Sequence, residues 1–276
     1  MSTSIDLAFV EKYADTVHMA YQQHGSKLRN TVRVKDNVQG ATVKFQKVGK
    51  GMAGKKTRHG NVPLMNVDHS TVTATMEDWY GADYCDMLDE VKINFDEVRV
   101  IADAGAFAVG RKIDALLLTA MAATSNAVEE AASGLNKAKI TEAVQRMNEN
   151  DVPDDGGRFC VVGAHQWEEL MHITEFASAD FVGDQLPFLK GTESKLWRGI
   201  TWLFHSGLPL SGGTRTCFMY HKNAIGLGEA KQMKAYIDWV PEKAAHLINH
   251  CLSAGAVLID PNGCVEIACD DDAALS

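Results

Sequence analysis

The pair His246 and His250 is the sharpest candidate for chemistry in the sequence. On a helix this spacing places both imidazoles on one face, where they can bind zinc. A zinc protease carries a glutamate directly after its first histidine, and this chain has Leu247 there. The surrounding residues also alternate as in a strand, where positions four apart are separated by about 13 Å. A metal-dependent hydrolase using His246 and His250 is thus kept as an alternative, and we predict no enzyme, no metal and no cofactor.

Two glycine-containing stretches could in principle cradle a phosphate. Residues 49–60 are rich in glycine and basic residues, but no apolar helix follows them as in a dinucleotide-binding unit. Gly105 and Gly110 have the spacing of a nucleotide loop, but Arg111 and Lys112 stand where Lys and Ser or Thr belong. We therefore expect no nucleotide site.

An acidic and aromatic segment, residues 77–93, contains Asp83, Asp86, Asp89 and Glu90. Their spacing does not match a calcium-binding loop. We interpret the segment as a solvated acidic surface, suited to receive a basic segment of a neighbouring molecule.

Composition limits the possible classes of protein. The 276 residues are enough for one large domain or two that share a core, and the net charge of −9 gives no general attraction to nucleic acid. No secretory signal and no apolar run of membrane-spanning length occur. The six cysteines form no C-x-x-C pair, which predicts free thiols, mostly buried, in a reducing cytosol.

A long helix is predicted over residues 94–124, where apolar residues keep helical spacing over many turns. Asn94 and Glu97 have the spacing of a capping box. Such a helix would be roughly 45 Å long, and its charged residues argue against a membrane span.

The segment before this helix predicts an extended β-hairpin. Alternating apolar residues, among them Val43, Phe45 and Val72, flank the glycine-rich basic stretch 49–60. A lone hairpin is not stable in water and must lie on another surface, for which an acidic copy of the same chain is a candidate. Residues 4–24 predict a short amphipathic helix that could act as a docking arm.

The rest of the chain mixes helices and strands. Helices are expected over 139–150, beginning at Thr141 and Glu142, and over 164–171. Strands are expected over 158–163, 197–209, 217–220 and 243–260, the last paired in a hairpin with 264–267. In strand 243–260, Ala245 and Leu247 would share one face, and His246, Ile248 and His250 would lie on the other.

This order of elements resembles the major capsid protein of tailed bacteriophages, the Hong Kong-type coat fold. The residues with the most specific local resemblance are 157–170, 199–209 and 254–267. The resemblance implies an α+β fold with an N-terminal arm, an extended β-hairpin loop, a long spine helix, and peripheral and axial domains. The implied ranges are 1–36 for the arm, 37–76 for the hairpin loop, 77–134 and 221–276 for the peripheral domain with spine helix 94–124, and 135–220 for the axial domain.

The resemblance also implies a structural function. The chain would assemble with itself into hexamers and pentamers of an icosahedral head enclosing viral double-stranded DNA, without sequence-specific DNA binding and without a membrane. It would be made in the host cytoplasm and end in the virion. Expected partners are a separate scaffolding protein, a portal and a decoration protein. The alternative with the same fold is the shell of an encapsulating nanocompartment, which contains cargo protein instead of DNA.

Contacts between subunits follow from the same resemblance. Basic residues of the hairpin would lie on acidic residues of a neighbour, each exposed pair contributing about 0–1 kcal/mol, and aromatic residues of the arm would supply apolar contact. The predicted contact residues are Lys50, Lys55, Lys56 and Arg58 of the hairpin, Asp83, Asp86 and Asp89 of the acidic segment, and Phe9, Tyr13 and Tyr21 of the arm. Some coats of this type cross-link a hairpin lysine to an asparagine, and Lys55 or Lys56 could serve, but no asparagine partner is identified.

Overall fold

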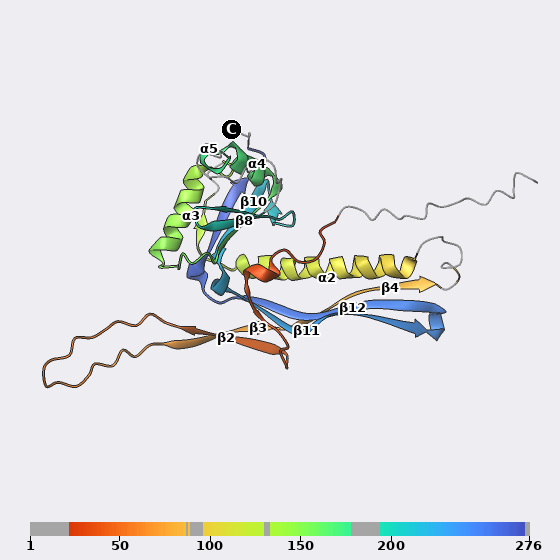
Figure 1. The fold of residues 1–276 in the computed structure, drawn as a ribbon, viewed down its shortest axis with the longest axis horizontal. Helices are drawn as coiled ribbons and strands as arrows, with labels where there is room; N and C mark the ends of the chain where they lie inside the picture. Colours follow the sequence, from red (N-terminus) through yellow and green to blue (C-terminus); the bar gives the residue numbers. More distant parts are fainter. Residues whose placement is uncertain (1–21, 87, 89–95, 130–132, 178–193, 274–276) are drawn as a thin grey trace, which may run out of the picture. The chain divides into compact units, whose positions relative to one another are not determined.

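The computed structural model describes residues 22–86, 88, 96–129, 133–177 and 194–273 (Figure 1). The chain forms two compact units. Unit 1 comprises residues 1–26, 78–112 and 232–252, and unit 2 comprises residues 27–77, 113–231 and 253–276. The predicted arm helix 4–24 lies almost wholly outside the described residues.

Unit 2 is built on a mixed seven-stranded sheet. Its order is β5-β13-β10-β6-β8-β7, with β9 paired to β10. The strands are β5 (Ala127–Val128), β6 (Arg158–Val162), β7 (Lys195–Trp197), β8 (Ile200–Phe204), β9 (Leu210–Ser211), β10 (Thr214–His221) and β13 (Cys264–Asp270). The central strand β6 is a continuous apolar run, with Cys160, Val161 and Val162 fully buried. Such a run is typical of a strand covered on both faces.

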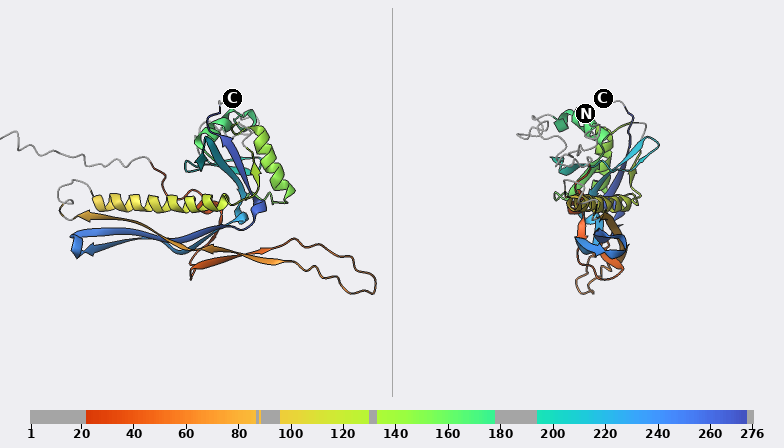
Figure 2. Two further views of the ribbon diagram at one scale, coloured as in Figure 1. Left: turned by 180° about the vertical axis from the view of Figure 1, so that it is seen from behind. Right: turned by 90° about the vertical axis from the view of Figure 1, so that its right-hand side faces the viewer.

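Helices cover this sheet within unit 2. Helix α3 (Lys137–Glu149) packs on β13 and β5, while α4 (Ala164–His172) packs on α5 (Thr174–Ala177) (Figure 2). Helix α3 begins earlier than predicted, because the side chain of Asn136 caps it by accepting the N–H of Lys139 at 2.9 Å. Phe176 of α5 is fully buried and meets Trp197 and Trp202 edge-on.

Two sequence predictions in this region are corrected. The stretch 197–209 is not one strand, because Arg198 and Gly199 have positive φ values of 53° and 73° and turn β7 back on β8. Strand β13 does not pair with the strand before it; it pairs with β10 and β5. The turn at Pro261–Gly263, capped by the side chain of Asp260, redirects the chain to the other sheet.

A second sheet has the order β1-β11-β12-β4. Its strands are β1 (Arg33–Lys35), β4 (Glu77–Asp86), β11 (Ile225–Val240) and β12 (Ala245–Leu258). Strand β12 confirms the prediction over 243–260, and Ile248 and His250 are both buried in it. The sequence reasoning missed β4 and β11, since charged residues in one and glycines in the other obscure the alternation of a strand.

The long helix is confirmed as α2 (Glu97–Met121), with Asp96 accepting the N–H of Arg99 at 3.1 Å before its first turn. Asn94, the predicted cap, lies outside the described residues. Within unit 1 the helix packs closely on strands β4 and β12. A Cβ on Gly105 would lie 2.5 Å from the ring of His250, and a Cβ on Gly81 would lie 3.4 Å from the carbonyl oxygen of Gly105. The helix and the sheet can therefore approach each other closely because glycines lie at the contact.

The predicted hairpin is present as β2 (Thr42–Val48) and β3 (His69–Thr75), an antiparallel pair in unit 2. Its root is anchored in the same chain: Phe45 is fully buried against Gly226, where a Cβ would lie 2.7 Å from the phenyl ring. Val43 packs in the same way on Gly228, where a Cβ would lie 3.2 Å from it. The hairpin thus needs no second molecule to hold its root.

Candidate assembly surfaces

The loop between β2 and β3, residues 49–68, continues the hairpin as a narrow ribbon. The N–H of Gly49 donates to the carbonyl of Asp68 at 2.8 Å. Further out, Met65 lies over Gly51 and Pro63 over Gly54, each so close that a Cβ on the glycine would overlap it. A turn closed by the N–H of Gly60 and the carbonyl of Thr57 forms the tip. Glycines therefore let the two arms of the loop lie side by side.

The four predicted basic residues all lie on this exposed ribbon. Lys55, Lys56 and Arg58 surround the tip turn and form no ion pair in the described part of the chain. Lys50 lies nearer the root and meets Asp151 of its own chain at 2.6 Å, with both side chains more than 70% exposed. Its hydrogen bond lowers the pKa of Asp151. The tip is thus a cluster of cations directed to solvent.

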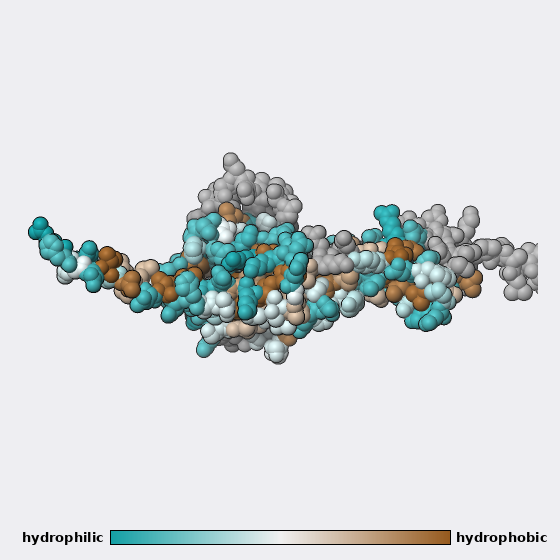
Figure 3. All heavy atoms as spheres, turned by 90° about the horizontal axis from the view of Figure 1, so that it is seen from below, coloured by the Kyte–Doolittle hydropathy of each residue, from teal (hydrophilic) through white to brown (hydrophobic). Residues whose placement is uncertain are grey.

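The same loop also exposes apolar side chains, which the sequence reasoning overlooked. Met52, Val62, Leu64 and Met65 are each more than half exposed. They form brown patches between the hydrophilic residues of the loop, at the left of Figure 3. Exposed apolar groups of this size, flanked by charges, are typical of surfaces that another molecule covers.

The predicted acidic partners Asp83 and Asp86 lie in strand β4 of unit 1. The Asp83 carboxylate accepts the N–H of Tyr84 at 2.8 Å, and the Asp86 carboxylate accepts the N–H of Leu88 at 2.7 Å. Asp83 is exposed and Asp86 is half-buried. Among the described residues, one oxygen of each carboxylate has no hydrogen bond, next to the exposed rings of Tyr80 and Tyr84.

A further exposed apolar site lies where β11 ends. Ile237 and Trp239 are 53% and 44% exposed, although they belong to a long strand. The Trp239 ring meets His246 edge-on at 5.0 Å between centroids. Figure 3 shows brown residues at this end of the β11–β12 ribbon, at the right. Only a correct prediction of β11 as a strand would have identified this surface from the sequence.

Four predicted contact residues cannot be placed. Phe9, Tyr13, Tyr21 and Asp89 lie outside the described residues. Their roles, like the pairing of the hairpin with a neighbour, stay predictions.

The predicted alternative of a metal hydrolase is not supported by the structure. His246 and His250 lie in strand β12 rather than on a helix, and His250 is buried against Gly105 with its Nδ1 unpartnered. In the described part of the chain, no group of three or more His, Cys, Asp or Glu could hold a metal. All six cysteines are free, as predicted.

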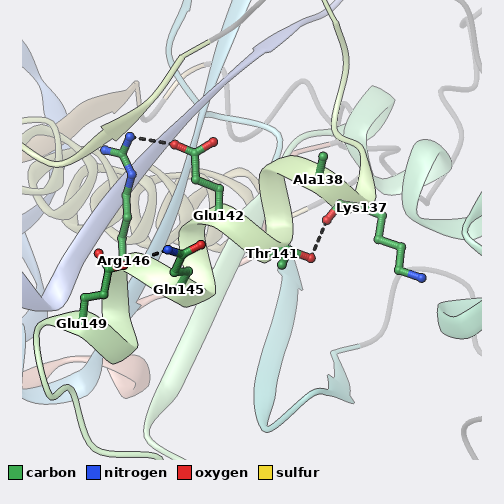
Figure 4. A pocket seen from close by; sticks show the side chains of 7 residues that line it. All are labelled: Lys137, Ala138, Thr141, Glu142, Gln145, Arg146 and Glu149. Atoms are coloured by element: carbon green, nitrogen blue, oxygen red, sulfur yellow. Dashed lines mark hydrogen bonds and ion pairs between the residues drawn. The ribbon is translucent and has the colours of Figure 1, made fainter.

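A hollow of about 890 Å³ lies over the exposed face of α3 (Figure 4). Its side chains bond to one another along the helix: Glu142 to Arg146 at 2.7 Å and Gln145 to Glu149 at 2.7 Å. It is a wide depression over polar side chains that pair with one another, and these side chains do not converge on a point where catalysis could occur. Among the described residues, no helix has the length and apolar character needed to span a bilayer.

Comparison with known proteins identifies the class. The family model described as phage capsid protein matches residues 5–271, so the chain belongs to the phage capsid protein family. No curated protein matches the chain by sequence.

Solved structures show the same fold along almost the whole chain. A chain of Mycobacterium phage Che8 is 16% identical, with a TM-score of 0.74 over 97% of this chain and 98% of that one. The capsid of cyanophage P-SCSP1u is also 16% identical, with a TM-score of 0.73 over 100% and 96%. The capsid of a native GTA particle is 12% identical, with a TM-score of 0.71 over 99% and 100%. The predicted Hong Kong-type coat fold is confirmed, and the family membership supports a structural role in a capsid shell.

Proposed function

We propose that this chain is the major shell subunit of a tailed-phage head. It assembles with itself into hexamers and pentamers, and the resulting icosahedral shell encloses double-stranded DNA. The family supports a phage capsid over a nanocompartment. In this proposal the ranges 1–36, 37–76, 77–134 with 221–276, and 135–220 act as arm, hairpin loop, peripheral domain and axial domain.

One observation carries the proposal at the level of residues. The hairpin root is buried in its own chain through Phe45, whereas the loop 49–68 is exposed nearly everywhere and bears both cations and apolar groups. A surface of this kind is stabilised when a complementary partner covers it. We propose that the partner is a second copy, whose β4 offers Asp83, Asp86 and exposed tyrosines.

Many weak contacts are sufficient in such a shell, because closed symmetric assemblies repeat each contact in every subunit. An exposed pair between Lys55 and a neighbour's carboxylate would contribute about 0–1 kcal/mol and would weaken as salt rises. The apolar residues Leu64 and Met65 would add a contribution that salt does not screen. Assembly should therefore depend on salt only in part.

The test uses the full chain in solution. Negative-stain microscopy and sedimentation of the purified protein should show capsomer rings or shells. Reversing the charge of the tip by Lys55→Glu, Lys56→Glu and Arg58→Glu together should abolish these particles. The control Lys222→Glu reverses the charge of an exposed lysine in the 3₁₀ turn Lys222–Ala224 and should leave the particles unchanged. A wild-type protein that stays monomeric at high concentration contradicts the proposal.

The contents and partners of the particle complete the proposal. Particles from infected cells should hold nuclease-protected DNA, and a packed cargo protein in its place would indicate a nanocompartment. A scaffolding protein, a portal and a decoration protein are the proposed partners, with synthesis in the host cytoplasm and final residence in the virion. Their presence can be tested by mass spectrometry of purified particles.

A further inference from the structure

The residues that follow the N-terminal arm, 22–28, lie along one face of helix α2. In unit 1, Arg111 donates to the side-chain oxygen of Gln22 at 2.6 Å, and Phe107 meets the ring of His24 edge-on at 4.2 Å. In unit 2, the Asp114 carboxylate accepts the backbone N–H groups of Lys27 and Leu28 at 3.0 and 3.1 Å. Segment and helix run in the same direction (Figure 1).

A glycine pair makes this close approach possible. A Cβ on Gly110 would lie 2.6 Å from the backbone of Gly25, a distance that real side chains do not tolerate. Gly25 itself has a positive φ of 70°, a conformation that glycine adopts without strain. Any larger residue at position 110 must push the segment off the helix.

The helix residues involved have a regular spacing. Phe107, Gly110, Arg111 and Asp114 are three, four and seven positions apart, which places them on one face of α2. Each supplies a different kind of contact: a ring, a gap, a cation and a buried carboxylate. The contacts of unit 1, from Phe107, Gly110 and Arg111, specify a single register of residues 22–26.

We infer that the face of α2 formed by Phe107, Gly110 and Arg111 in unit 1 is a docking track that fixes where the arm leaves the subunit. These residues are positioning residues for assembly, since they hold residues 22–26 and thereby set which neighbouring surface the arm can reach. The inference rests on the proposed function, because direction matters only if the arm meets another subunit.

The decisive variant is Gly110→Ala in the full chain. Alanine favours a helix more than glycine does, so α2 itself should be at least as stable, and only the seating of segment 22–28 is disturbed. Thr119→Ala, at an exposed position of the same helix, is the matched control. We expect amide hydrogen exchange at Lys27 and Leu28 to become about 10- to 100-fold faster in Gly110→Ala and to stay unchanged in the control.

The assembly readout separates positioning from folding. Gly110→Ala should still unfold in one cooperative transition, yet give particles of uneven diameter or capsomers that do not close. Arg111→Ala should show a milder form of the same defect, and Arg111→Lys, which keeps a cationic donor, should restore uniform particles.

Two results would overturn the inference: unchanged amide exchange in Gly110→Ala, or faster exchange in Gly110→Ala together with particles as uniform as those of the wild type. If the wild-type chain forms no particles at all, the proposed function fails, while the exchange result still decides whether the track seats the segment.

Discussion

The imidazole of His205 lies 3.0 Å from the carboxylate of Asp114, and the two side chains are only 4% and 1% exposed. His205 Nδ1 accepts the N–H of Gly207 at 3.0 Å, so Nε2 carries the proton that is donated to Asp114. With its two bonds to Lys27 and Leu28, the Asp114 carboxylate therefore accepts three hydrogen bonds in a buried site.

Asp114→Asn should destabilise the protein by about 2–4 kcal/mol. An amide group in place of the carboxylate turns one of its acceptors into a donor, which would face other donors. Unfolding in urea, monitored by tryptophan fluorescence, measures the change. Asp103→Asn, at an exposed position of the same helix, is the control and should change stability by less than about 0.5 kcal/mol. Equal effects of both substitutions would contradict the predicted role of the buried carboxylate.

Gly226→Ala should displace the hairpin root, because the added Cβ would lie 2.7 Å from the ring of Phe45. We expect a loss of about 1–3 kcal/mol, as for other overpacked cores. The double variant Gly226→Ala with Phe45→Leu should lose less than the two single changes added together, since the smaller side chain makes room. A double-mutant cycle on the unfolding free energy measures this coupling. Strict additivity would show that the two residues do not press on each other.

Stability should fall in acid through Asp271. The hydrogen bonds from Arg215, opposed by partial burial and aided by Gln166, lower the pKa of this carboxyl to about 2. Because the folded pKa is below the unfolded value, the stabilising contribution is present above about pH 4 and is lost as the pH falls toward 2. The full contribution is about 2 kcal/mol.

The variant Asp271→Asn isolates this contribution. The difference in unfolding free energy between wild type and variant should shrink steadily from about pH 5 to about pH 2.5. A difference that stays constant over this range would assign the acid sensitivity to other groups.

Cysteine reactivity should follow burial. Desolvation raises the pKa of the Cys264 thiol to about 12 and that of Cys160 well above its usual range. Only Cys251 is partly exposed among the six. Iodoacetamide at neutral pH should therefore modify Cys251 in the native subunit and the other five only after unfolding. Peptide mass spectrometry reads the sites directly, and rapid native modification of Cys160 would disprove the prediction.

How far sequence reasoning reached depended on whether the signal was local. Helix α2 and strand β12 were found because their periodicity lies within the segment, and the hairpin because glycines and basic residues interrupt an alternating pattern. Strand β11 was missed because Gly226 and Gly228, which weaken a strand, are there to receive Phe45 and Val43 from a distant segment. This requirement comes from tertiary packing, so it produces no periodic pattern in the sequence.

The candidate surfaces likewise divide into features that have a local sequence signal and features that have none. The cations of the tip were evident from the run of basic residues, whereas the apolar half of the loop was overlooked because Met52 and Leu64 follow no period there. The track on α2 was also missed, because Gly110 was considered only as part of a nucleotide loop. The need for glycine at position 110 is evident only from the structure, where the backbone of Gly25 approaches it closely.

The glycine-lined ribbon of residues 49–68 has a thermodynamic consequence for growth of the shell. Fixing a disordered backbone costs about 1–2 kcal/mol per residue, which can cancel the gain from a modest contact area. Here Met65 and Pro63 lie close against Gly51 and Gly54, so the two arms of loop 49–68 contact each other within one subunit. A loop that is restrained before assembly has less entropy to lose on binding, so weak contacts between subunits can be sufficient while staying reversible enough for misplaced subunits to leave.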